Sequence, residues 1–175
     1  VLLLLTFFSY AFVDSNLIYY KNIYSGFAFQ NRTVVALLYF VFIFLLFAFY
    51  LFVLKLVNKK HLHLKDILIL IGMACVALIF SYPAMLSYDI FNYITTAKVL
   101  FLYHENPYII FPIEFIGDPY LFFTHAANKL ALYGPAWVLL SAVPHHLGIG
   151  NFVLTLVSFK LVSAIFYLLT VWVLW

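Results

Sequence analysis

Residues 33–57 read TVVALLYFVFIFLLFAFYLFVLKLV, a continuous apolar run interrupted by one charged side chain, Lys55. Such a run is long enough to cross the hydrocarbon core of a bilayer, which needs about 20 apolar residues. Over all 175 residues, 67% are hydrophobic and only 9% are charged, whereas soluble domains carry roughly a quarter charged residues. The sequence therefore predicts an integral membrane protein rather than a water-soluble domain.

Four further apolar runs flank this one, so we expect an all-α, polytopic, multi-pass membrane protein. Apolar runs stand at both ends of the chain, which we interpret as a fragment of a longer protein. An alternative for the first run is the apolar part of a signal peptide, although no basic segment precedes it. The expected spans of this single transmembrane domain are 1–13, 33–57, 67–85, 136–147 and 152–175.

The distribution of charge predicts the orientation. The turn after the second span carries Lys55, Lys59, Lys60 and Lys65, and no other short loop is as basic. By the positive-inside rule this turn is cytoplasmic, which places the loops 14–32 and 87–135 outside the cell membrane. The His61-Leu62-His63 pair within the turn is either a solvated basic anchor or part of a metal site. The anchor is favoured because no carboxylate or third histidine lies nearby in sequence.

The segment after the third span predicts an amphipathic helix. Ser81-Tyr82-Pro83 should end that span, because proline lacks a backbone donor, and Ser87 is a suitable N-cap for the next helix. Polar residues then recur at helical spacing on one face, and apolar residues line the opposite face. We expect this juxtamembrane helix to lie along the membrane surface with its polar face toward an aqueous cavity. The polar positions are Asp89, Asn92, Tyr93 and Thr96, and the apolar ones are Ile90, Ile94, Ala97 and Phe101.

Asp89 is the candidate catalytic residue. It lies in the first turn of the expected helix, where the helix dipole favours an ionised carboxylate. A carboxylate at a membrane boundary is costly unless it has a partner or a task. Two interpretations remain open, a helix-terminal charge and a general base. The following loop to residue 135 is long, and long loops are more often functional than simple connections.

An ordered series of residues in this outer segment resembles a sequence block in membrane glycosyltransferases of the GT-C class. The nearest relatives we suggest are the polyprenyl-phosphate-mannose-dependent mannosyltransferases. Four positions depart from that block, where Asn92, Thr96, Ala97 and Lys98 replace its arginine, acidic residue, glycine and arginine. The series comprises Asp89-x-x-Asn92-Tyr93, Ala97-Lys98, Asn106-Pro107-Tyr108, Pro112 and Tyr133-Gly134-Pro135.

The resemblance implies a GT-C-like bundle of transmembrane helices with a catalytic outer loop, 87–135. It implies inverting transfer of a sugar, with mannose expected, from a polyprenyl-phosphate donor to a glycan or lipid-linked acceptor on the outer face. By position Asp89 would be the base. The resemblance implies no cofactor, and neither a metal nor a nucleic acid partner is expected; membrane lipids surround the site.

Several side chains in the outer segment are candidate substrate ligands. A departing phosphate requires a cation. Lys98 and Lys129 are the first local candidates, and His104 and His125 are the second. Each histidine is alternatively an ordinary polar loop residue, and each tyrosine is alternatively an interfacial anchor rather than a stacking surface for a sugar. The full set is Tyr88, Asn92, Tyr93, Lys98, His104, Asn106, Tyr108, His125, Lys129 and Tyr133.

Two other classes of protein remain open. A transporter or flippase would carry ionisable groups or broken helices at mid-membrane, and Lys160 is the one charge well inside an apolar span, whereas the acidic groups cluster in the outer loop. A non-catalytic membrane subunit would explain the absence of a second acid at Thr96.

Overall fold

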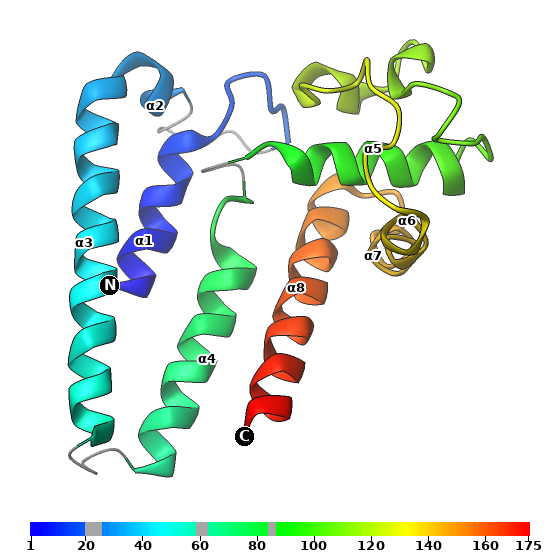
Figure 1. Cartoon of the computed structure of the whole chain (residues 1–175). Coiled ribbons are helices and arrows are strands. Elements are labelled where there is room, and N and C mark those ends of the chain that lie inside the picture. The colour runs from blue at the N-terminus through cyan, green and yellow to red at the C-terminus, as the bar shows by residue number, and fades with distance from the viewer. Residues whose placement is uncertain (20–25, 59–62, 84–86) are drawn as a thin grey trace.

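The computed structural model describes residues 1–19, 26–58, 63–83 and 87–175, and within these ranges it contains helices and no strand. Four helices stand side by side, and a fifth, α5, lies crosswise above the end of α8 (Figure 1). A short helix, α2 (Phe27–Gln30), precedes the first long one. The upright helices are α1 (Leu2–Ser9, continued by η1, Tyr10–Phe12), α3 (Arg32–Asn58), α4 (Leu64–Phe80) and α8 (Phe152–Leu174).

Two helices, α3 and α8, are long and apolar enough to cross a membrane. They confirm the helices predicted over 33–57 and 152–175. None of the most apolar stretch of α3 is buried against the rest of the chain, and large side chains such as Phe40 and Phe44 are exposed. Because exposed aromatic and aliphatic side chains of this density are unfavourable in water, the surface of α3 suits lipid contact.

The third predicted span, 67–85, corresponds to α4, which begins three residues earlier, at Leu64, and ends at Phe80. The Ser81 amide still donates to the Ala77 carbonyl, but the Ser81 backbone is already extended. Pro83 explains this end, because its ring would clash with the carbonyl four residues earlier. The predicted break at Ser81-Tyr82-Pro83 is therefore confirmed.

The stretch 136–147, expected as one short span, folds instead as two six-residue helices, α6 (Pro135–Leu140) and α7 (Ala142–Leu147). Together they are too short for a hydrocarbon core of about 30 Å. Pro135 occupies the first turn of α6, where a missing amide is harmless. Pro144 explains the break at Ser141, because it has no amide to donate to Leu140 and its ring crowds that carbonyl.

The crosswise helix α5 (Asp89–Phe101) confirms the helix predicted after the third span. It is more enclosed than the surface helix that the pattern predicted. Phe91 and Ile94 form a core with Phe123 and Phe152, and Thr96, expected to face an aqueous cavity, is buried. The loop after α5, with its short helices η3 (Pro112–Glu114) and η4 (Pro119–Phe123), packs onto the helix and causes this burial.

Candidate active site at the start of helix α5

Asp89 is the first residue of α5, and its side chain is exposed. Tyr88 is the N-cap residue, one position later than the predicted cap. Ser87 nevertheless contributes, because its Oγ accepts the Asp89 amide at 3.1 Å. The helix dipole stabilises an anion at this end. The carboxylate of Asp89 is therefore held near a fixed backbone position while its oxygens remain open to solvent.

A tyrosine from the end of the outer loop completes the surroundings of Asp89. The Tyr133 hydroxyl lies beside the Asp89 carboxylate and Tyr93, one turn along α5, and interacts with both. The Tyr93 and Tyr133 rings meet edge to face at 4.5 Å, and Trp137 lies 5.1 Å from Tyr93 on another side. Burial first, then the neighbouring Tyr93 and the Asp89 charge, raises the pKa of the Tyr133 hydroxyl. Tyr133 therefore stays protonated next to the Asp89 carboxylate.

A second carboxylate, Asp14, lies close to the start of α5 and was not predicted from the sequence as a site residue. It is buried, and its Oδ2 is 3.1 Å from His125 Nε2. The His125 ring stacks on Tyr88 with centroids 4.0 Å apart. Burial raises the pKa of Tyr88 to about 12, and the Asp14 charge adds to this effect. The contact thus joins the first helix to the outer loop beside the residue that precedes Asp89.

Polar atoms without protein partners gather on the same part of α5. Within the described residues, Tyr88 Oη, Asn92 Oδ1 and Trp137 Nε1 are buried and accept or donate no hydrogen bond. Asn92 lines a small cavity with Lys129 and Tyr133, and Lys129 is exposed. Buried polar groups are usually paired in proteins, so each such group invites an explanation such as a water or a ligand.

Lys98 lies in the interior instead. Its Nζ is 2.5 Å from Asp118 Oδ2, and the two side chains are 11% and 5% exposed. The ammonium also lies over the Tyr120 ring, 3.7 Å from its centroid. Asp118 accepts two more hydrogen bonds, from the Tyr103 hydroxyl at 2.8 Å and from the Tyr120 amide at 2.9 Å. Lys98 is therefore committed to a contact that holds the outer loop on α5.

The remaining predicted ligands lie at the far end of α5. His104 and Asn106 are exposed, and with Tyr108 and Leu139 they line a cavity of about 450 Å³. The 13 residues of α5 separate this cavity from Asp89 by about 20 Å. Tyr108 connects the cavity to the residues around Asp89, because its hydroxyl donates to the Tyr133 carbonyl at 2.7 Å. The structure thus places the predicted residues in two groups.

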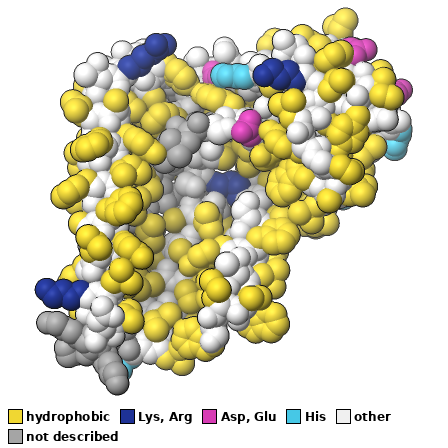
Figure 2. Space-filling view, in the orientation of Figure 1, with side chains coloured by type: hydrophobic (Ala, Val, Ile, Leu, Met, Phe, Trp, Pro, Cys, Tyr) yellow, Lys and Arg dark blue, Asp and Glu magenta, His cyan; other side chains and the backbone are white. Residues whose placement is uncertain are grey.

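Figure 2 shows acidic, basic and histidine side chains along the edge of the crosswise layer, and hydrophobic side chains covering the upright helices. In the part of the chain that the structure describes, no three His, Cys, Asp or Glu side chains come together as a metal site requires. Lys59, Lys60 and His61 of the predicted basic turn lie outside the described residues. His63, next to them, is exposed, and its amide donates to Asp66 Oδ2 at 3.0 Å.

Comparison with known proteins gave one finding. A family model described as "Alpha-(1->6)-mannopyranosyltransferase, N-terminal domain" matches residues 1–175, the whole chain. Comparisons with curated proteins and with solved structures gave no significant match.

Proposed function

This chain belongs to the alpha-(1->6)-mannopyranosyltransferase N-terminal domain family, and from this membership we propose that it transfers mannose from a polyprenyl-phosphate donor to a glycan or lipid-linked acceptor. The family itself supports a glycosyltransferase that moves mannose. The donor, the stereochemistry, the membrane side and the roles of single residues are our proposals. They rest on the arrangement around the start of α5.

One observation carries the assignment of the base. Asp89 is an exposed carboxylate at a helix N-terminus, with the protonated Tyr133 hydroxyl beside it. A sugar phosphate already has a good leaving group, so the enzyme must mainly remove a proton from the acceptor hydroxyl. In the proposed step Asp89 takes that proton while the acceptor oxygen bonds to the anomeric carbon. The bond from that carbon to the phosphate oxygen breaks, and the phosphate leaves with the electron pair.

The proposed stereochemistry follows from the linkage that the family name specifies. If the chain makes an alpha linkage by a single displacement, the donor must carry its mannose in the beta configuration. A single displacement needs one base and no covalent sugar intermediate. Asp89 alone satisfies this requirement, and a second acid at position 96, where the chain has threonine, is not needed for the step itself.

The apolar helices support a lipid-linked donor. Helix α5 lies across the ends of upright helices whose outer surfaces are apolar (Figures 1 and 2). A prenyl tail would remain among these helices while the sugar reaches the start of α5. We also propose that this end of the bundle faces outward, because Lys55, in the last turn of α3, and Lys65, in the first turn of α4, lie at the opposite end.

The two groups of polar residues suggest two parts of one substrate path. We assign Asn92 and Lys129, beside Tyr133, to the transferred sugar, since Asn92 Oδ1 lacks a protein partner. The cavity at the other end of α5, near His104 and Tyr108, has polar side chains at its rim and is wide enough for part of a glycan. We assign this cavity to the distal part of the acceptor.

A transfer assay tests the proposal. The full-length protein in membranes receives a radiolabelled polyprenyl-phosphate mannose and an acceptor, and wild type is compared with Asp89→Asn. We expect the variant to insert normally and to lose transfer by about 10²- to 10⁴-fold, as for removal of a general base. Asp66→Asn is the matched control, because this half-buried acid also lies in the first turn of a helix, α4, at the other end of the bundle.

Each alternative predicts a different result. Equal transfer by wild type and Asp89→Asn would remove Asp89 from the mechanism. Movement of the labelled lipid across the bilayer without transfer by wild type would favour a flippase, and absence of both activities would favour a non-catalytic subunit.

A further inference from the structure

Lys160 is a buried cation within one of the two long apolar helices, α8. It lies two turns into α8, between hydrophobic stretches, and is 8% exposed. Its ammonium donates to the carbonyl of Ser81, the residue that follows α4. Figure 2 shows a Lys or Arg side chain inside the hollow between the upright helices. The proposed mechanism has not used Lys160.

No carboxylate balances this charge in the part of the chain that the structure describes. The two ion pairs there join Lys98 to Asp118 and His125 to Asp14. A buried ammonium without a counter-ion costs several kcal/mol, and one backbone carbonyl offsets only part of that cost. Ionisable side chains within membrane helices are therefore expected to have a function. A cation without an anion calls for an anionic ligand.

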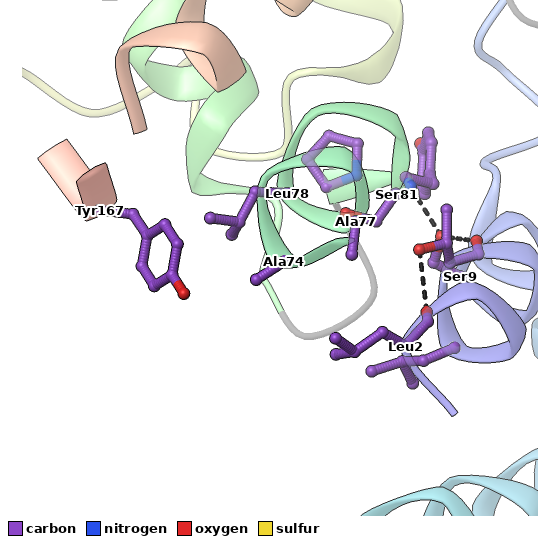
Figure 3. A pocket seen from close by; sticks show the side chains of 11 residues that line it. Leu2, Ser9, Ala74, Ala77, Leu78, Ser81 and Tyr167 are labelled. Atoms are coloured by element: carbon purple, nitrogen blue, oxygen red, sulfur yellow. Dashed lines mark hydrogen bonds between the residues drawn. The ribbon is translucent and has the colours of Figure 1, made fainter. Parts of the chain in front are cut away.

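A cavity of about 430 Å³ adjoins the Lys160 contact. It lies between α1, α4 and α8 and is lined mainly by apolar side chains such as Leu2, Ala74 and Leu78 (Figure 3). Ser81 lines the cavity and at the same time accepts the hydrogen bond of Lys160. Ser9, across the cavity, accepts the Tyr82 amide at 2.7 Å and is itself a polar group on the wall.

The cavity therefore has a polar end and an apolar end. Ser9, Ser81 and the adjacent cation lie near the C-terminal end of α4, and most of the remaining wall, as far as Tyr167 on α8, is hydrophobic. A ligand that fits has an anionic head, which lies toward Asp89, and an apolar tail, which lies among the upright helices. The volume of the cavity is within the usual range of small-molecule sites, about 300–1,000 Å³.

We propose that Lys160 binds the phosphate of the lipid-linked sugar and that this cavity holds the first part of its prenyl chain. The inference rests on the proposed function and adds to it a substrate-binding residue and a path for the lipid. Lys129, exposed on the loop, faces the sugar from the aqueous side, whereas Lys160 approaches the phosphate from the lipid side. A phosphate held there leaves its sugar nearer to α5, against which α8 packs.

A direct binding measurement tests this inference without any transfer. The full-length protein in nanodiscs is titrated with farnesyl phosphate and, separately, with farnesol. We expect Lys160→Gln to weaken farnesyl phosphate binding at least tenfold and to leave farnesol binding unchanged. Lys55→Gln is the matched control, because Lys55 also follows an apolar stretch but lies near the opposite end of the bundle. Equal affinity of wild type and Lys160→Gln for farnesyl phosphate would overturn the proposal.

A second variant keeps the test informative if Lys160→Gln does not fold. Ala74→Leu keeps the lysine and fills the cavity from its α4 wall. We expect it to weaken farnesyl phosphate and farnesol by the same factor. Unchanged binding of both ligands would exclude this cavity as the prenyl site.

The two proposals fail in different ways. Loss of transfer in Asp89→Asn together with unchanged farnesyl phosphate binding in Lys160→Gln would overturn the lysine assignment alone. Weakened binding in Lys160→Gln together with full transfer by Asp89→Asn would leave the lipid site in place and refute the proposed base.

Discussion

The buried contact between Lys98 and Asp118 allows a quantitative prediction. Replacing Lys98 with methionine keeps an unbranched side chain that is one atom shorter and removes the charge. Asp118 then loses its partner at 2.5 Å while remaining only 5% exposed. Removing one member of a buried ion pair costs about 3–5 kcal/mol of folding free energy. We expect the lower part of this range, because Asp118 retains the Tyr103 hydroxyl and the Tyr120 amide as donors.

The reverse replacement is expected to cost more. Asp118→Leu leaves the Lys98 ammonium with two aromatic rings, 3.7 Å from the centroid of Tyr120 and 5.8 Å from that of Tyr103, and without a counter-ion among the described residues. It also removes the acceptor for the Tyr120 amide, a loss of about 1 kcal/mol for a capping contact. We therefore expect about 5 kcal/mol. In the double variant no charge is left unpaired, so its cost should be smaller than the sum of the single costs by about 1–3 kcal/mol.

Equilibrium unfolding of the detergent-solubilised full-length protein, followed by tryptophan fluorescence, measures these costs. Lys129→Met is the matched control, because it removes an exposed lysine from the loop that carries Asp118. It should change stability by less than about 0.5 kcal/mol. The reasoning is refuted if Lys98→Met costs no more than Lys129→Met. It is also refuted if the double variant costs as much as the two single variants added together.

Three further predictions concern other contacts. Tyr133→Phe keeps the ring packing but removes the hydroxyl that lies beside the Asp89 carboxylate. A polar contact to a charged group is worth about 1.5–3 kcal/mol, so turnover should fall about ten- to hundredfold with little change in donor binding, and an unchanged turnover would contradict this. Lys160→Met removes an uncompensated buried charge, so the unfolding free energy should rise by about 1–3 kcal/mol; a loss of stability would mean that the Ser81 contact dominates. Burial raises the pKa of Tyr103 to about 12, so its contribution to stability should be full below pH 10 and be lost as the pH rises from 10 to 12. Tyr103→Phe should flatten that part of the stability profile, and an identical profile would contradict the assignment.

The sequence predicted the local features of the fold well. Helix boundaries near Pro83 and the helix that begins by Asp89 were predictable, because proline chemistry and helical spacing depend on neighbours in the chain. The division into two short helices from Pro135 onward was not predicted, because the apolar character of the stretch was given more weight than the helix-breaking effect of Pro144. The burial of Thr96 was also missed, since it depends on a loop that returns over α5 from later in the sequence.

The candidate site was predicted only in part. Asp89, Tyr93 and Tyr133 were singled out from the motif and do lie together. Asp14 was not, because its partner His125 is 111 residues away and no local pattern connects them. The one sequence signal for Asp14 was an acidic residue directly after an apolar run. Lys98 looked like a free cation for the same reason, since its partner Asp118 comes from the loop.

The role of Asp89 as the base is tested most directly by single-turnover transfer from a saturating lipid-linked donor. Under these conditions binding and product release do not limit the rate, so the measured rate reports the chemical step. The account predicts that Asp89→Asn binds farnesyl phosphate as wild type does and transfers mannose at least about 100-fold more slowly. Transfer at the wild-type rate, or a loss of transfer that is explained entirely by weaker donor binding, would contradict it.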